Sequence, residues 1–370
     1  MSNQILVNLS ILFSKPTGLS VYATNLFPYL QPLDPTLLIA TVVSDSLPQA
    51  SLFTHQPIPD NLTPAHGSKG HFRRLLWTQL QLPRLYQKLQ SRLLFSPIPE
   101  APLYSNCRCV VVVHDLIPLR FPRSLSPLTN YWRYYVPQVL ATAEHIICDS
   151  TATARDITDF FGVSSAKITP IPLGYDHDHF RPLELDSQST GEDNPYFLYI
   201  GRHDPYKNLN RLIEAFASLN NCHDYQLLIA GPIDPRYTPE LQAKAAQLDL
   251  TEQVKFLDYL AYEQLPTIIN QAIALVFPTL WEGFGLPVLE AMGCGTPVIT
   301  SNLSSLPEVA GDAALLVNPY NTSEIAEAMQ AVVNDADLRS HLSKLGLQQA
   351  SQFSWAKTGQ ATVEVLGRYL

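Results

Sequence analysis

The chain has 370 residues, which is too long for one compact α/β core and suits two domains. Hydrophobic residues make up 46% of it and charged residues 15%, a balance that excludes a disordered protein. The formal net charge of −9 argues against a general nucleic-acid binder, so no nucleic-acid partner is expected.

The sequence offers no sign of membrane insertion or secretion. No apolar run reaches the roughly 18 residues that span a bilayer, and the first 13 residues lack the basic start of a signal peptide. The five cysteines are odd in number and fall mostly in apolar runs, as expected of reduced, buried thiols. We therefore expect a cytoplasmic protein.

Short apolar runs alternate with helix-like segments along the first half. The strand-like runs are residues 5–9, 37–43, 93–95, 110–113 and 145–148. This alternation predicts a parallel sheet with helices on both faces. A polar stretch near residues 182–194 then resembles a linker.

The same alternation restarts after the linker, with strand-like runs at 196–200, 226–230, 254–257, 274–277 and 297–300. The pattern predicts two successive doubly wound domains. Ligands of open α/β sheets bind at the carboxyl ends of the strands, so the polar residues that follow these runs are the candidates for a site.

The first candidate is Gly18, which lies in Thr17-Gly18-Leu19-Ser20 after the first strand and before a helix. Such a turn can place backbone N–H groups on a phosphate. It is not a G-x-G-x-x-G fingerprint, which disfavours an NAD-dependent oxidoreductase.

A basic segment, residues 69–92, follows in a region without Asp or Glu. Its apolar residues recur at helical spacing, and Pro83 is expected to divide it into two helices. One interpretation is an amphipathic surface that contacts an anionic membrane or a phosphorylated acceptor. The other is a solvated helix pair packed on the first domain.

His114 ends a strand of four valines and is followed by Asp115. An imidazole at the carboxyl end of a strand can bind a substrate hydroxyl or move a proton near neutral pH. Asp115 could orient it or cap the next segment. A structural histidine is the alternative.

The segment Gly201-Arg202-His203-Asp204-Pro205-Tyr206-Lys207-Asn208 follows the strand at 196–200. Arg202 and Lys207 place two cations at a turn, an arrangement that suits a diphosphate. The alternative is a basic turn that only closes a loop.

The strongest signal is Trp281-Glu282-Gly283-Phe284-Gly285-Leu286-Pro287-Val288-Leu289-Glu290, directly after the strand at 274–277. The glycines allow a ligand to approach the backbone, and the start of the following helix favours an anion. Glu282 and Glu290 can each accept hydrogen bonds from the paired hydroxyls of a sugar ring.

At this point the residues resemble a known family over almost the whole chain. Glu282 and Glu290 look like the E-x7-E motif of the family 4 retaining glycosyltransferases, and Gly201-Arg202 with Lys207-Asn208 resembles that family's diphosphate segment. Gly18 matches its first glycine loop. The pair Gly231-Pro232 departs from the family pattern because it lacks a nearby partner glycine.

The resemblance implies a GT-B fold, with two Rossmann-like domains that face each other across a cleft. The expected domains are an acceptor-side domain at 1–182, a donor domain at 183–353 and a helix at 354–370 that crosses back to the first domain. The donor substrate is then a nucleotide-diphosphate sugar, without any cofactor.

The resemblance also implies a role for each site residue. Arg202 and Lys207 would neutralise the diphosphate, Glu282 would bind the transferred sugar, Glu290 would bind the ribose, and His114 would contact the donor sugar. The backbone of Phe284, Gly285 and Leu286 would assist. The base would lie near residues 255–262.

Within the family, residues 73–83 and 114–119 resemble a bacterial branch rich in mannosyltransferases of polysaccharide synthesis. This favours GDP-mannose as the donor and a saccharide or lipid-linked saccharide as the acceptor. The enzyme would then be cytoplasmic, or peripheral at the inner face of the membrane.

Other readings remain. A nucleotide-sugar epimerase or hydrolase could use a similar scaffold, and a non-catalytic homologue could bind nucleotide alone. No metal is expected, although Asp176/Asp178 and Asp335/Asp337 form two D-x-D patterns, since oxygen-ligand sites need several convergent groups.

Overall fold

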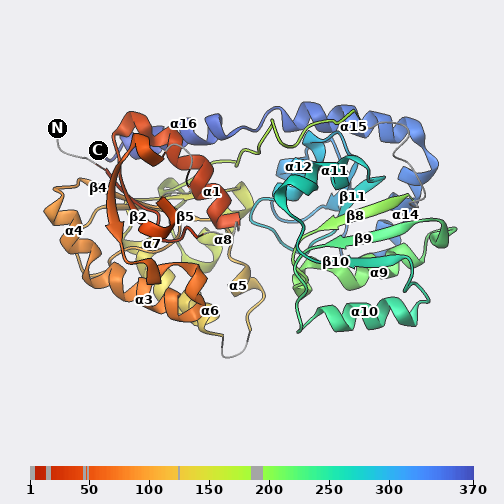
Figure 1. Ribbon diagram of the computed structural model, residues 1–370, viewed down its shortest axis with the longest axis horizontal. Helices are drawn as coiled ribbons and strands as arrows, with labels where there is room; N and C mark the ends of the chain where they lie inside the picture. Colours follow the sequence, from red (N-terminus) through yellow and green to blue (C-terminus); the bar gives the residue numbers. More distant parts are fainter. Residues whose placement is uncertain (1–4, 14–17, 45–46, 48–49, 124–125, 185–194) are drawn as a thin grey trace. The chain divides into compact units, whose positions relative to one another are not determined.

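The computed structural model of the protein describes residues 5–13, 18–44, 47, 50–123, 126–184 and 195–370 (Figure 1). They form two compact units. The first comprises Met1–Gly174 with Trp355–Leu370, and the second comprises Tyr175–Ser354. The remainder of the polar linker, residues 185–194, and Thr17 of the first glycine loop lie outside the described residues.

The first unit is built on a seven-stranded sheet in which every pair is parallel. The spatial order is β3-β2-β1-β4-β5-β6-β7. The bounds are β1 Ile5–Asn8, β2 Thr36–Ala40, β3 Thr54–Ile58, β4 Leu93–Ser96, β5 Cys109–Val113, β6 His145–Cys148 and β7 Ile168–Pro170. The chain order reverses between β1 and β4, which is the switch point of a doubly wound sheet.

Helices cover this sheet. They are α1 Gly18–Leu26, α2 Thr41–Ser44, α3 Gly67–Leu80, α4 Leu82–Lys88, α5 Ile117–Arg120, α6 Pro127–Asn130, α7 Val136–Thr142 and α8 Thr151–Phe161. A π-helical turn, η5 Tyr131–Tyr135, joins α6 to α7. The expected division of the basic segment at Pro83 is confirmed, because that proline lies in the first turn of α4.

The second unit contains a six-stranded parallel sheet of order β10-β9-β8-β11-β12-β13. Its strands are β8 Tyr196–Ile200, β9 Gln226–Ala230, β10 Val254–Leu257, β11 Ala274–Phe277, β12 Val298–Ser301 and β13 Leu315–Val317. The switch point lies between β8 and β11, so the loops that follow these two strands meet there.

The helices of the second unit are α9 Leu209–Ala217, α10 Thr238–Gln247, α11 Leu265–Asn270, α12 Leu286–Gly293, α13 Leu306–Ala310, α14 Thr322–Asn334 and α15 Ala336–Ala350. The N-terminus of α15 is capped by Asp335, whose side chain accepts from Leu338 N at 2.8 Å. That contact gives the second D-x-D pattern a local role.

The last helix, α16 Trp355–Gly367, belongs to the first unit. Helix α16 packs closely on the short helix η1 Phe27–Leu33 at Gly359, where a Cβ would lie 2.3 Å from Tyr29 Cβ. The first unit ends at Gly174, before the boundary expected at residue 182, because Tyr175 packs on Gly293 of the second unit at a position where a Cβ would lie 2.4 Å from its ring.

Ten strand-like runs predicted from the sequence correspond to strands of the structure, and three strands were missed. The missed strands β3, β7 and β13 all lie at sheet edges. The run expected at 37–43 ends earlier, at Ala40, because α2 begins at Thr41. No helix formed by the described residues combines the length and apolar character that crossing a membrane requires.

Candidate functional site

The loops that follow β8 and β9 come unusually close at the carboxyl edge of the second sheet. Gly231 has φ +156°, and a Cβ there would lie 1.9 Å from the carbonyl oxygen of Gly201. The partner glycine that appears to be missing beside Gly231 in the sequence is therefore Gly201, supplied by the neighbouring strand. Gly231 needs to lack a side chain for the two loops to approach, whereas a Cβ on Gly201, which has φ +152°, would lie 2.8 Å from the Tyr199 hydroxyl.

At the switch point, two predicted site residues from different loops form an ion pair. Lys207, in the short helix η7 Pro205–Lys207, places its Nζ 2.7 Å from Glu282 Oε1. Only 12% and 11% of the two side chains are exposed. The ammonium also lies over the Tyr206 and Phe277 rings, at 5.3 and 5.4 Å from their centroids. The structure thus brings together two groups that are far apart in sequence and largely shields them from water.

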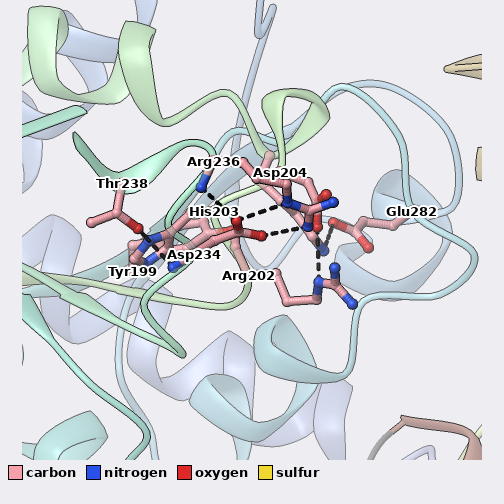
Figure 2. Close-up of polar contacts among 9 residues, drawn as sticks. Tyr199, Arg202, His203, Asp204, Asp234, Arg236, Thr238 and Glu282 are labelled. Carbon is pink, nitrogen blue, oxygen red and sulfur yellow. Dashed lines mark hydrogen bonds and ion pairs between the residues drawn. The ribbon is translucent and has the colours of Figure 1, made fainter. Parts of the chain in front are cut away.

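Arg202 lies on the same loop but is open to solvent. Its Nε donates to Asp204 Oδ2 at 2.8 Å, while 61% of the side chain is exposed (Figure 2). Asp204 itself is buried, and Tyr199 donates its hydroxyl to the Arg202 carbonyl at 3.0 Å. The guanidinium is therefore anchored through one nitrogen, with its outer face available to a phosphate.

A further cation, which the sequence analysis missed, joins this cluster. Arg236 follows β9 and donates to both carboxylate oxygens of Asp234 (Figure 2). These hydrogen bonds, together with the positive charge of Arg202, hold the pKa of Asp234 well below its usual range. The signal was present in the sequence, because Arg236 is a cation shortly after a strand end.

The Glu282 loop is held by serine hydroxyls and leads into α12. Glu282 N donates to Ser304 Oγ at 3.0 Å, and Ser305 Oγ donates to the carbonyls of Glu282 and Phe284 at 3.1 and 2.6 Å. Gly285 has φ +123°, and a Cβ there would lie 2.7 Å from Leu306 Cδ2.

This loop leaves donors available at the start of the helix. Among the described residues, none accepts a hydrogen bond from the backbone N–H of Phe284, Gly285 or Leu286. Together with the positive end of the helix dipole, these groups form an anion-binding surface.

Glu290 lies one turn into α12, where burial raises its pKa to about 7. No group of the described residues forms a hydrogen bond with this carboxylate. Tyr262, in the loop after β10, feels its charge: burial, the charge of Asp176 and then that of Glu290 raise the Tyr262 pKa. The carboxylate can thus accept hydrogen bonds from a ligand without first losing a protein partner.

His114 lies at the carboxyl edge of the first sheet, directly after β5. Its Nδ1 is 2.7 Å from Asp149 Oδ2, and its Nε2 is 2.9 Å from the carbonyl oxygen of Pro97. The Pro97 carbonyl can only accept, so Nε2 carries a hydrogen, and a second proton lies between Nδ1 and Asp149 Oδ2. Burial raises the pKa of Asp149, and the charge of His114 and its hydrogen bond lower it. Burial lowers the His114 pKa, but the Asp149 charge and the two hydrogen bonds outweigh it and raise the pKa overall.

The remaining predicted positions have simpler surroundings. Gly18 is the first residue of α1, and nothing lies within 4 Å of a Cβ placed on it. Asp115 caps the next segment, since its Oδ1 accepts from Ile117 N at 2.9 Å. Asp176 Oδ1 likewise accepts from the backbone N–H groups of Asp178 and His179. Within the described parts of the chain, no three His, Cys, Asp or Glu side chains are grouped to hold a metal ion.

Two family patterns match the sequence and together cover most of it. The pattern described as "Glycosyltransferase Family 4" matches residues 16–179, and that described as "Glycosyl transferases group 1" matches residues 181–349. The boundary between the two matches lies close to the boundary between the two compact units.

Relatives in sequence are bacterial. The chain is 36% identical over 266 residues to the O-antigen chain mannosyltransferase B of Escherichia coli, a match that covers 69% of each chain. It is 28% identical over 277 residues to the serotype-specific mannosyltransferase WbdA of the same organism, covering 71% of this chain and 34% of that protein. The chain thus spans about a third of the length of WbdA.

Solved structures share the fold along the full chain. Sucrose-phosphate synthase from Thermosynechococcus elongatus matches with a TM-score of 0.78 and 19% identity, over 99% of this chain and 98% of that one. Anabaena HepE in complex with UDP and glucose matches with a TM-score of 0.76 and 20% identity, over 99% of both chains. These matches and the two parallel sheets confirm the expected fold of two Rossmann-like domains.

Proposed function

The chain belongs to the family 4 glycosyltransferases, and we propose that it is a retaining hexosyltransferase that takes mannose from GDP-mannose. The observation that carries this proposal is the Lys207–Glu282 pair at the switch point of the second sheet. It places a shielded cation and a carboxylate beside the unpaired N–H groups at the start of α12, a combination that suits a sugar diphosphate.

In the proposed reaction the diphosphate leaves the anomeric carbon as negative charge builds on its oxygen. Arg202, Lys207 and the N–H groups of Phe284, Gly285 and Leu286 would stabilise that charge. Glu282 would bind hydroxyls of the transferred sugar, and Glu290 those of the ribose. The acceptor hydroxyl would attack from the same face, and the departing phosphate would take its proton.

The proposal of mannose rests on the two relatives named as mannosyltransferases. HepE, which was solved with UDP and glucose, makes UDP-glucose the necessary comparison. The acceptor would be a saccharide or lipid-linked saccharide. We further propose that the protein works in the cytoplasm or at the inner face of the membrane, with contact through residues 69–92.

A thermal-shift panel of GDP, UDP, ADP and dTDP with their sugar nucleotides, with and without EDTA, tests the donor. Binding to the folded state raises the melting temperature by linkage. The proposal expects the largest shift with GDP-mannose and no effect of EDTA, because no metal or other cofactor takes part. No shift with any nucleotide would favour a homologue without this activity.

The role of Glu282 is tested by Glu282→Ala in a sugar-transfer assay. We expect loss of transfer with nucleotide binding kept. Full activity of this variant would rule out the role given to Glu282. Release or isomerisation of sugar by the unaltered protein without any acceptor would instead identify a hydrolase or an epimerase.

A further inference from the structure

Helix α3 carries an apolar stripe on its outer face. Its inward side chains include Arg74 and Trp77, which are buried. Phe72, Leu76 and Leu80 point outward, with 61%, 46% and 59% of their surface exposed. Their spacing of four residues aligns them along one side of the helix. A stripe of large apolar side chains on the solvent side of a helix marks a contact surface.

The charge around this stripe is mostly positive. One acid, Asp60, is exposed in the short helix η3 Asp60–Leu62, which packs against α3, and its carboxylate accepts from Val42 N at 3.1 Å. Lys69 and Arg73 are exposed in the same turns of α3. Neither residues 61–99 nor residues 116–143 contain an Asp or Glu, although the whole chain has a formal net charge of −9. The local excess of cations is therefore a property of this face and not of the protein as a whole.

The π-helical turn η5 extends the surface. His71 of α3 contacts Tyr131 of η5 with ring centroids 5.1 Å apart, and Gln79 Nε2 donates to Tyr135 Oη at 3.0 Å. Beside these contacts η5 exposes Arg133 and Tyr134, the latter with 63% of its surface exposed. An exposed tyrosine and an exposed cation thus belong to an element that packs against α3.

The buried side of α3 is bonded to the segment that follows β4. Arg74 Nε and one terminal nitrogen each lie 2.8 Å from an oxygen of Glu100, and both side chains are almost fully buried. Gln79 also donates to the Ala101 carbonyl at 3.0 Å. These contacts fix the segment that follows β4, whose Pro97 carbonyl holds His114. The outer face of α3 is thus linked, within one unit, to the carboxyl edge of the first sheet.

We propose that this face of α3, with Arg133 and Tyr134 of η5, binds an anionic lipid surface. The stripe would enter the boundary between headgroups and acyl chains, and Lys69, Arg73 and Arg133 would lie among lipid phosphates. This narrows the basic segment 69–92 to α3, because α4 exposes cations but no large apolar side chain. This contact rests on the proposed function, since it would bring the enzyme to lipid-linked acceptors. Binding to lipid does not itself require the sugar-nucleotide donor.

Vesicle co-sedimentation of the full chain tests the proposal. Vesicles of phosphatidylcholine with about a third phosphatidylglycerol are compared with pure phosphatidylcholine. One variant carries Phe72→Ser, Leu76→Ser and Leu80→Ser, and another carries Lys69→Gln, Arg73→Gln and Arg133→Gln. The matched control, Lys344→Gln with Leu347→Ser, removes one exposed cation and one partly exposed leucine from α15.

We expect the unaltered chain and the control to bind anionic vesicles and to bind neutral ones far more weakly. Each lost cation should lower the partition coefficient about fivefold, and thus the charge variant about 100-fold. Each serine should lower it by at least about tenfold. Thermal melting and nucleotide binding, which is assigned to the second unit, verify that the variants fold.

Equal binding of both vesicle types, or unchanged binding by the apolar variant, would overturn the proposal. If the unaltered chain self-associates in gel filtration and the apolar variant does not, the stripe binds a second copy of the chain and the lipid proposal is wrong. Nucleotide binding without lipid binding would leave the transferase proposal standing and refute this one alone.

Discussion

The raised pKa of Glu290 predicts that the protein binds its donor more tightly as the pH rises. The ordinary glutamate pKa is near 4.5, and burial in this site raises it to about 7. In the proposed function the ribose hydroxyls would donate to the ionised form of Glu290, so the proton would have to leave before the ligand binds. About one molecule in eleven is ionised at pH 6 and about ten in eleven at pH 8, so affinity should rise about tenfold over this range.

Isothermal titration calorimetry with GDP-mannose measures this effect. The sugar nucleotide is preferred over GDP because its diphosphate is esterified at both ends and does not titrate near neutral pH. Runs in buffers of different ionisation enthalpy should show close to one proton released at pH 6 and almost none at pH 8. The nearby Cys294 has its pKa raised to about 12 and stays protonated throughout.

Glu290→Gln provides a second readout without ligand. Because the pKa of Glu290 is higher in the folded protein than in the unfolded chain, its protonated form stabilises the fold. This contribution to the free energy of unfolding is complete below pH 4.5 and is lost as the pH rises through about 7. The free energy of unfolding of the unaltered protein therefore falls by about 3 kcal/mol by pH 8, and that of the glutamine variant does not. A variant no more stable than the original at pH 8, or one that retains the pH-dependent affinity, would refute the reasoning.

Three other expectations follow from the same contacts. In urea unfolding, Lys207→Met should destabilise the protein by about 3 kcal/mol, because it leaves the shielded Glu282 carboxylate without its partner. Adding Glu282→Gln should restore most of that stability. Strictly additive effects of the two substitutions would show that the pair is not coupled. Asp149→Asn should be most destabilising below pH 6.5, and the deficit should shrink as the pH rises through the raised His114 pKa; a constant deficit across urea titrations would contradict that raised pKa. Gly231→Ala should destabilise by more than about 2 kcal/mol, since its Cβ would meet backbone 1.9 Å away, and a melting temperature unchanged in calorimetry would contradict the close approach.

The central strands could be predicted from sequence because burial on both faces demands continuous apolar runs. The strand β5, Cys109–Val113, is buried at every position and consists mostly of valine. The edge strand β3 has only one fully buried residue, Ile58, and contains Pro57, which an edge tolerates and a central strand does not. Its pattern is that of a loop, so periodicity could not reveal it.

The sequence indicated which residues belong to the site but not which of them contact each other. Polar residues after strand ends indicated Lys207 and Glu282 separately, yet they are 75 positions apart, and only the strand order brings them to one switch point. Sequence also could not show that both nitrogens of His114 already face acceptors. That arrangement depends on Asp149 and on the Pro97 carbonyl, which come from two other strand ends.

The Lys207–Glu282 pair has a consequence for the order of events in the proposed reaction. Each charge is satisfied by the other, so a ligand that takes one leaves the other shielded and unpaired, at a cost of several kcal/mol. In the proposed binding mode a sugar nucleotide would carry partners for both, because its diphosphate would replace Glu282 at Lys207 and its sugar hydroxyls would replace Lys207 at Glu282. The nucleotide diphosphate left after transfer carries only the first. We therefore expect the pair to favour the intact donor over the nucleotide diphosphate by more than the sugar contacts alone provide, and its re-formation would help to expel the product.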